Sequence, residues 1–296
     1  MNSRRRREGP GGPPWPQTAP RQRSAGPYHA RVNSPTPPTR PLCAACTLLV
    51  TGAGRGIGAA TARLAAARGW DVAVNYTRDE AAAAAVVRDV RAAGRRGWVV
   101  QADVGDEVQV MAMFAALDAE VAAGRLAPLA GLVNNAGIVD LPARVDEMSG
   151  ARMERMFRIN VFGSMWCARE AVRRMSTKYG HAGGAIVNLG SAASRLGSPG
   201  QYVDYAASKG AIDVFTLGLA RELAAEGVRV NAVRPGIIET DIHASGGLPE
   251  RARQLAPSVP MQRAGSAGEV AAAIVWLLSG EASYTTGALI AVSGGR

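Results

Sequence analysis

Short apolar runs alternate with longer segments of helical pattern from about Cys46 to the end of the chain. The apolar runs predict strands at 47–50, 71–75, 98–102, 129–134, 185–189, 229–233 and 289–292. The segments between them predict helices near 57–69, 79–94, 105–124, 150–178, 203–226 and 267–279. Strands that alternate with helices are typical of βαβ units, whose right-handed crossovers build a parallel sheet. We therefore predict an α/β fold with one doubly wound, seven-stranded parallel sheet and helices on both faces.

The basic charge of the chain is concentrated near its start. Residues 1–41 contain eight arginines and one acid, Glu8, so they carry +7 of the net +10 of the 296-residue chain. This stretch is rich in Pro and Gly and lacks an aliphatic run, so we expect 1–44 to be a disordered extension and 45–296 to form one domain. A misassigned start, a targeting segment and a polyanion-binding tail stay open for the extension. The domain itself has too small a charge excess to suggest a nucleic acid partner.

Hydropathy and cysteine content bear on the environment of the protein. No stretch approaches the roughly 18–20 apolar residues of a membrane span, and no signal-peptide core is present. The odd cysteine count fits a reducing compartment. We therefore expect a cytoplasmic protein without a membrane partner. Cys43 and Cys46 have the spacing of a metal or thiol-exchange site, but no second pair accompanies them, so we expect no metal.

A glycine-rich segment, TGAGRGIG at 51–58, directly follows the first predicted strand and precedes a predicted helix. Glycines there allow a tight turn and let the N–H groups of the helix start approach a pyrophosphate. The spacing of Gly52, Gly56 and Gly58 differs from the commoner G-x-G-x-x-G, and a plain turn is the alternative. Its place between a strand and a helix favours a dinucleotide site of the Rossmann type.

The residues after the second strand bear on which dinucleotide is bound. NAD-specific sites place an Asp or Glu there, about 20 residues past the glycines, to bind the ribose 2′-OH. This chain has the segment NYTR at 75–78 instead, and Arg55 lies in the glycine loop. Without a carboxylate to repel a 2′-phosphate, and with Arg55 and Arg78 to pair with it, we predict that NADP(H) is preferred. NAD(H) stays possible, because both arginines could simply be solvated.

Two further strand ends carry residues suited to the same ligand. Asp103 follows the third strand and is placed to bond an adenine amino group, and the NNAG segment at 134–137 follows the fourth, on the ribose side.

A tyrosine and a lysine lie four residues apart in the sequence YAASK, Tyr205 to Lys209, and therefore share one helix face. A free tyrosine has a pKa near 10, so we expect the Lys209 cation to lower the pKa of Tyr205 and make it a usable proton donor. Ser191 follows the fifth strand and could polarise a substrate carbonyl. Asn160, in the preceding helix, could hold a water that relays protons to Lys209. Alone, the Y-x-x-x-K spacing arises by chance.

The order of these motifs is more specific than any one of them. The glycine loop, NNAG, Asn160, Ser191, YAASK and the RPG segment at 234–236 succeed one another along the predicted sheet, whose carboxyl edge is where open α/β sheets bind ligands. Over nearly all of 46–296 the set resembles the short-chain dehydrogenase/reductase family, notably its 3-oxoacyl reductases and sugar dehydrogenases. The resemblance implies that the catalytic residues are Asn160, Ser191, Tyr205 and Lys209. With the motifs above, it implies cofactor contacts at Gly52, Arg55, Gly56, Ile57, Gly58, Tyr76, Thr77, Arg78, Asp103, Val104, Asn135, Ala136, Gly137, Tyr205, Lys209, Pro235, Gly236, Ile238 and Thr240.

The same resemblance implies a hydride transfer between the nicotinamide and a small carbonyl or alcohol substrate. It also implies a homotetramer or dimer packed through the helices 105–124 and 150–178, and a substrate lid at 237–262, in which His243 is more simply a surface residue. The chain departs from the family pattern in two ways. The gap from Ser191 to Tyr205 is one residue longer than usual, and Ser194 offers a second hydroxyl within it. The last strand has Ala291 where the family usually has an acidic residue. The alternatives are an NAD-linked sugar or alcohol dehydrogenase and a non-catalytic nucleotide-binding sensor.

Overall fold

The computed structural model describes residues 45–240, 246–248 and 250–296. Its main strands are β1 (Thr47–Val50), β2 (Asp71–Tyr76), β3 (Gly97–Gln101), β4 (Leu129–Asn134), β5 (Gly184–Leu189), β6 (Val228–Pro235) and β9 (Leu289–Val292). Its helices are α1 (Gly56–Ala67), α2 (Glu80–Ala92), α3 (Glu107–Ala122), α4 (Gly150–Phe157), α5 (Gly163–Met175), α6 (Ala193–Leu196), α7 (Val203–Leu223), α9 (Arg251–Leu255) and α10 (Ala267–Leu278). The predictions for 1–44, Cys43 and His243 fall outside the described residues.

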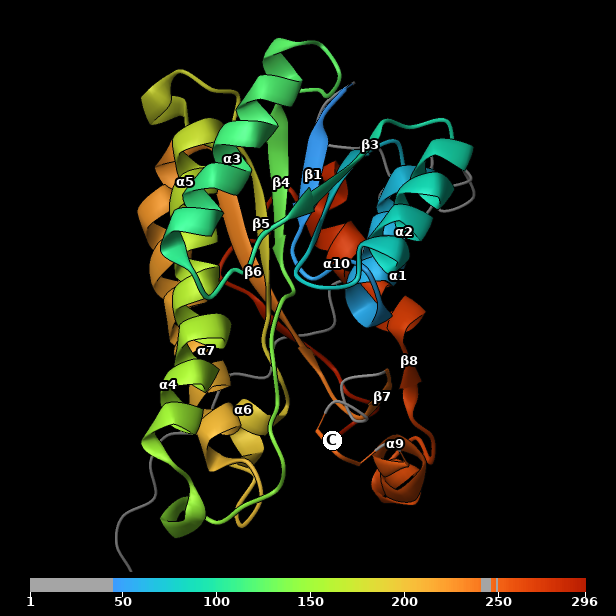
Figure 1. Ribbon diagram of the computed structural model, residues 1–296, viewed down its shortest axis with the longest axis vertical. Helices are drawn as coiled ribbons and strands as arrows, with labels where there is room; N and C mark the ends of the chain where they lie inside the picture. The colour runs from blue at the N-terminus through green and yellow to red at the C-terminus, as the bar shows by residue number, and fades with distance from the viewer. Residues whose placement is uncertain (1–44, 241–245, 249) are drawn as a thin grey trace, which may run out of the picture. The chain divides into compact units, whose positions relative to one another are not determined.

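The seven main strands form one sheet in the order β3-β2-β1-β4-β5-β6-β9, and every neighbouring pair is parallel. The chain moves outward from β1 to β3, returns to place β4 on the other side of β1, and then continues outward to β9 (Figure 1). The direction of winding therefore reverses between β1 and β4. This topology confirms the predicted doubly wound sheet, and ligands of such sheets bind at the carboxyl ends of the strands beside that reversal.

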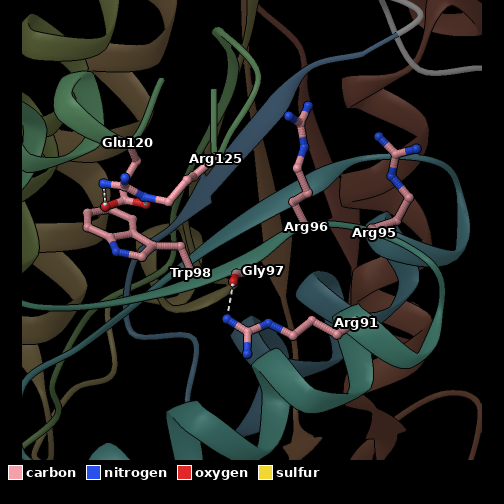
Figure 2. Close-up of a pocket in the computed structure, with 7 residues that line it drawn as sticks. All are labelled: Arg91, Arg95, Arg96, Gly97, Trp98, Glu120 and Arg125. Atoms are coloured by element: carbon pink, nitrogen blue, oxygen red, sulfur yellow. Dashed lines mark hydrogen bonds and ion pairs between the residues drawn. The ribbon is translucent and has the colours of Figure 1, made fainter. Parts of the chain in front are cut away.

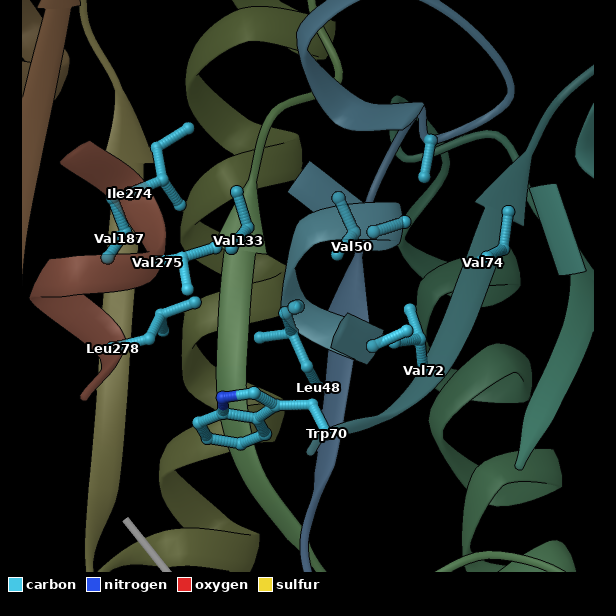
Figure 3. Close-up of a cluster of buried hydrophobic side chains, with 14 of the residues drawn as sticks. Leu48, Val50, Trp70, Val72, Val74, Val133, Val187, Ile274, Val275 and Leu278 are labelled. Atoms are coloured by element: carbon cyan, nitrogen blue, oxygen red, sulfur yellow. The ribbon is translucent and has the colours of Figure 1, made fainter. Parts of the chain in front are cut away.

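Helices cover both faces of the sheet and enclose two apolar cores. α1, α2 and α10 pack on one face, and α3, α5 and α7 on the other (Figure 1). Successive strand residues serve opposite cores: Leu48 and Val50 of β1 belong to the first, and Leu49 between them to the second. Figure 3 shows the first core, in which strand side chains from β1, β2, β4 and β5 gather with those of α10.

The structure differs from the sequence-based expectation in the long helix predicted at 150–178. Three consecutive segments replace it: α4, a π-helical turn at Arg158–Phe162, and α5, which ends at Met175. A short parallel pair, β7 (Ile238–Glu239) with β8 (Gly265–Ser266), was also not predicted, because two-residue strands carry no periodic pattern.

No helix in the described ranges is long and apolar enough to cross a membrane.

Trp70 tests the energetic role of the first core, since its large side chain is only 1% exposed and lies beneath β4 at Gly131. We expect Trp70→Ala to lower the free energy of unfolding by about 3–5 kcal/mol in urea denaturation, because it removes a buried ring and leaves a cavity. Trp70→Phe retains an aromatic ring and should lose clearly less. Equal losses in the two variants would contradict this account of the core.

Candidate active site

The glycine loop after β1 needs its glycines for reasons visible in the backbone. Gly52 and Gly56 have φ values of +60° and +54°, in the left-handed region that favours glycine. A Cβ on Gly58 would lie 2.5 Å from Asn135 Nδ2 and 2.7 Å from Gly52 O, so no other residue fits without moving the loop. The loop therefore keeps a compact turn whose backbone is open to a ligand.

Asn135 and Thr51 fasten this loop to the end of β4. Asn135 Nδ2 donates to Thr51 O at 2.8 Å and to Gly52 O at 3.0 Å. The Thr51 hydroxyl in turn accepts from the backbone N–H groups of Asn135 and Ala136, each at 3.0 Å. The NNAG segment thus contributes to the predicted cofactor site by holding the glycine loop in position.

Helix α1 begins in a way that suits an anion. The helices α2, α3 and α10 each have a side-chain cap and an acidic residue in the first turn, as with Asp79 and Glu80 of α2. At α1 the N-cap residue is Arg55, with no side-chain cap and no acid in the first turn. Since the first N–H groups of a helix need acceptors and the helix dipole favours negative charge, this start fits a pyrophosphate.

The end of β2 is more acidic than the sequence pattern suggested. Asn75 is fully buried beneath the glycine loop, where its Oδ1 accepts from Gly52 N at 3.1 Å. The Tyr76 phenol, in contrast, faces the carboxylate of Glu80, whose charge and hydrogen bond add to burial in raising the pKa of Tyr76. Thr77 and Arg78 are exposed beside them. The start of α2 thus brings one carboxylate, Glu80, near Tyr76, which the NYTR segment itself does not contain.

Asp103 and Val104 follow β3 and have different surroundings. Asp103 Oδ1 accepts from Gly105 N at 2.8 Å, which fixes the carboxylate at the strand end. Val104 is only 4% exposed and belongs to the second core. A Cβ on Gly163 would lie 2.7 Å from Val104 O, so the carbonyl is packed as well. Asp103 keeps its predicted place at the cofactor edge, whereas the Val104 side chain serves packing.

The segment after β6 also reaches the glycine loop. Pro235 O accepts from Ala192 N at 2.9 Å, and a Cβ on Gly236 would lie 2.7 Å from Ser293 Cα. Ile238 is 4% exposed in the first core. Thr240 lies beside the loop, since a Cβ on Gly56 would be 3.5 Å from Thr240 Cβ. The carboxyl ends of β1 and β6 therefore bound one site.

The predicted catalytic hydroxyls lie together. Ser191 follows β5, and its hydroxyl lies near enough to the phenol of Tyr205 on α7 to lower the pKa of that phenol. Ser191 Oγ also accepts from Ala193 N at 3.1 Å, which orients it. Ser194 instead donates back to Ser191 O at 2.8 Å. The geometry thus favours Ser191 over Ser194 as the partner of Tyr205.

Lys209 has a buried ammonium beside this pair. Its side chain is 5% exposed, and Nζ donates to Leu189 O at 2.7 Å, at the end of β5. Nζ lies 5.7 Å from the centre of the Tyr205 ring. Burial lowers the pKa of Lys209 to about 8, against an opposing effect of the Asp213 carboxylate. Lys209 is therefore an ammonium that can release its proton near neutral pH.

The predicted effect of Lys209 on Tyr205 is corrected by the structure. The pKa of Tyr205 is raised, because burial disfavours the phenolate and outweighs the hydrogen bond from Ser191. The ammonium donates to the Leu189 carbonyl, and burial rather than Lys209 dominates the pKa of the phenol. In this state Tyr205 is a protonated acid, ready to donate.

Asn160 lies in the π-helical turn and is fully buried. Its Oδ1 accepts from Ile138 N at 2.8 Å, and its Nδ2 donates to Ile138 O at 3.0 Å and to Ser208 Oγ at 3.1 Å. A Cβ on Gly137 would be 3.2 Å from Asn160 Oδ1 and 3.6 Å from Lys209 Nζ, so the amide and the ammonium border the same glycine. Asn160 therefore holds the loop after β4 against α7. π-Helical turns of this kind occur frequently at functional sites.

A buried ion pair that the sequence analysis missed sets the start of α7. Arg152 of α4 donates from Nε to Asp204 Oδ2 at 2.8 Å and from Nη1 to Leu141 O at 2.7 Å. Asp204 Oδ1 also accepts from Tyr205 N at 2.9 Å. The partners are 52 residues apart in the sequence, so no local pattern indicates the pair.

An arginine-lined hollow of about 280 Å³ lies at the other edge of the sheet, by the amino end of β3 (Figure 2). Its charges are largely matched: Arg95 and Arg96 pair with Asp71, and Arg125 pairs with Glu120. Arg91 donates to Gly97 O at 3.0 Å. Because strand direction separates this edge from the Tyr205 edge, the hollow is not part of the candidate active site.

Comparison with known proteins identifies the family to which the chain belongs. Residues 52–296 match a family model described as enoyl-(acyl carrier protein) reductase. An uncharacterized oxidoreductase of Escherichia coli, YgfF, is 55% identical over 248 residues, covering 84% of this chain and 98% of that protein. The chain belongs to the short-chain dehydrogenase/reductase family. A 3-oxoacyl-[acyl-carrier-protein] reductase of Staphylococcus aureus, FabG, is 36% identical over 83% of this chain and 96% of its own length.

Solved structures of the family agree with the fold. A short-chain dehydrogenase from Burkholderia cenocepacia in complex with NADP has a TM-score of 0.73 and 34% identity, covering 84% of this chain and 97% of that one. The angucycline C-6 ketoreductase LanV with bound NADP has a TM-score of 0.77 and 32% identity, covering 84% and 95%. Members of this family are oxidoreductases that act on CH–OH groups with NAD(P), and this chain is one of them.

Gly58 offers a direct test of the glycine loop. We expect Gly58→Ala to weaken NADPH binding at least about tenfold in a fluorescence titration, because the new Cβ meets both Asn135 and the backbone of Gly52. Gly218→Ala is the matched control, since nothing lies within 4 Å of the added methyl on α7, and it should leave the affinity unchanged. Equal affinities for the two variants would show that the loop does not hold the cofactor.

Proposed function

We propose that the protein is an NADP(H)-dependent reductase of a small ketone or aldehyde, in which Tyr205 donates the proton. The observation that carries the proposal is the Ser191 hydroxyl beside the Tyr205 phenol, together with the buried Lys209 ammonium on the same helix. These groups border the edge of the sheet where the glycine loop and Thr240 meet. A proton donor next to a dinucleotide site is the arrangement that carbonyl reduction needs.

The roles follow from which groups carry protons. Ser191 and Tyr205 would hold the carbonyl oxygen of the substrate by two hydrogen bonds, which stabilise the negative charge that develops on it. Tyr205 would then transfer its phenolic proton to that oxygen, and Lys209, with a pKa of about 8, would supply a replacement proton. When bound, NADPH supplies the hydride. Asn160 positions the loop after β4 and contacts Ser208 on α7, and so supports the face that carries Lys209.

The residues suit NADPH in particular through their charges. Arg55 lies on the loop after β1 and Arg78 follows β2, and both are exposed. Guanidinium groups bind phosphates in two-pronged fashion, so we assign the 2′-phosphate to these two residues. The Glu80 carboxylate interacts with the Tyr76 phenol, so it already has a partner within the protein. The two family members described above with bound NADP support this choice over an NAD-linked sugar or alcohol dehydrogenase.

An exposed apolar face supports the proposal of a homodimer or homotetramer. Val108 and Met111 of α3 are 75% and 49% exposed, and Phe162, which is 47% exposed, packs against Trp166 of α5. Such a patch on two neighbouring helices is typical of a subunit contact.

Tyr205→Phe removes the acid and keeps the ring. We expect kcat for NADPH-dependent ketone reduction to fall by about 10²–10⁴-fold, because no other hydroxyl can replace the proton donor, while NADPH binding is retained. Ser194→Ala is the control, since its hydroxyl donates to a backbone carbonyl, and its kcat should stay within about threefold. Undiminished turnover in Tyr205→Phe would overturn the mechanism.

Cofactor preference tests the arginines. We expect the wild-type protein to bind NADPH more tightly than NADH. Arg55→Ala or Arg78→Ala should each lower the affinity for NADPH by about 10–100-fold, because each removes a charged hydrogen bond of about 1.5–3 kcal/mol. The affinity for NADH should change little. Arg88→Ala, an exposed arginine farther along α2, should change neither affinity. Tighter NADH binding in the wild type would favour the NAD-linked alternative.

A further inference from the structure

A second buried ion pair lies one helical turn beyond Lys209. Asp213 of α7 receives hydrogen bonds on both carboxylate oxygens from Arg234 of β6, with Nε to Oδ1 at 3.0 Å and Nη2 to Oδ2 at 2.9 Å. The two side chains are only 8% and 16% exposed. Buried ion pairs add little net stability, because desolvation offsets their attraction, so the position of this pair suggests a different role.

The pair packs against the backbone that supports the catalytic groups. A Cβ on Gly190 would lie 3.1 Å from both Asp213 Oδ1 and Arg234 Cγ. The pair therefore packs against Gly190, the residue between Leu189 and Ser191. Leu189 O is the acceptor of the Lys209 ammonium, and Ser191 is the partner of Tyr205. Asp213 and Lys209 are also four residues apart, on one face of α7.

The charged and polar groups around Lys209 come from four elements. The Tyr205 phenol and the Asp213 carboxylate come from α7 itself, and β5 supplies the Leu189 carbonyl. The π-turn supplies the neutral Asn160 amide, which borders Gly137 as Lys209 does. β6 supplies Arg234, whose charge is paired with Asp213. Asp213 is thus the one carboxylate that opposes the loss of the Lys209 proton in this part of the described structure.

We propose that Asp213 is a positioning residue that keeps the Lys209 ammonium charged and in place, with Arg234 as its anchor. The inference deepens the proposed function, on which it rests for its catalytic meaning. Burial favours the neutral amine of Lys209, and the fixed carboxylate favours the ammonium that the proton transfer requires. Arg234 keeps the carboxylate fixed through its two contacts with Oδ1 and Oδ2.

The composition of the chain allows a direct test. Lys178 and Lys209 are its only lysines. In protein labelled with ¹³C at lysine Cε, NMR therefore shows two side-chain signals, and Lys178→Arg identifies that of Lys209. A pH titration then reads the pKa of Lys209 without any substrate, so its result does not depend on the proposed reaction.

We expect Asp213→Asn to lower the pKa of Lys209 by about one unit or more, which is a tenfold shift of the protonation equilibrium. Asp213→Glu keeps the charge and should restore most of the wild-type value. Glu170→Gln is the matched control, because it disrupts a buried carboxylate–arginine cluster on α5 and should reduce the melting temperature without moving the Lys209 signal. An unchanged pKa in Asp213→Asn would overturn the proposal.

A double variant separates the lost carboxylate from the arginine that it leaves unpaired. In Asp213→Asn/Arg234→Met both charges are absent, and we expect the pKa of Lys209 to stay below that of the wild type. A return to the wild-type value would overturn the proposal, because the shift in the single variant would then come from the unpaired guanidinium. If Asp213→Asn fails to fold, the double variant alone still decides the question, since it leaves no buried charge unpaired.

Discussion

The parallel arrangement of the strands is the constraint on which the site depends. Because every strand runs in the same direction, the glycine loop after β1, Ser191 after β5 and the proline–glycine segment after β6 emerge at one edge. Hydrogen bonds across that edge then fix the loops to one another, as Asn135 does for the glycine loop and Pro235 O does for Ala192 N. The sheet delivers the residues to one place, and these buried bonds determine their positions.

Burial and charge act against each other at the catalytic groups. Tyr205 and Lys209 are both desolvated, which keeps the phenol protonated and makes the ammonium easier to deprotonate. The hydroxyl of Ser191 and the carboxylate of Asp213 work in the opposite direction on their respective neighbours. Burial thus favours the protonated phenol of Tyr205, whereas it lowers the pKa of Lys209 to about 8.

The sequence was sufficient to predict the sheet because its strands are buried on both faces and read as apolar runs. It also predicted Asn160, Ser191, Tyr205 and Lys209 as one set, and the structure brings these four residues to the same edge of the sheet. It did not predict the π-turn at Asn160, because no local residue type marks it. Contacts between segments far apart in the sequence were equally invisible, as with the Arg152–Asp204 pair, whose partners are 52 residues apart. The prediction of a lowered pKa for Tyr205 was wrong, because burial raises that pKa and burial depends on the tertiary structure.

The central claim is that this edge of the sheet carries out hydride transfer to a carbonyl carbon. Mass spectrometry of the products formed from a panel of ketones and aldehydes tests it most directly, with NADPH that carries deuterium at both hydrogen positions of nicotinamide C4. The account predicts an alcohol product with one deuterium on the former carbonyl carbon. Tight NADPH binding without deuterium transfer to any carbonyl in the panel would contradict it, and would indicate a nucleotide-binding protein that does not reduce carbonyl compounds.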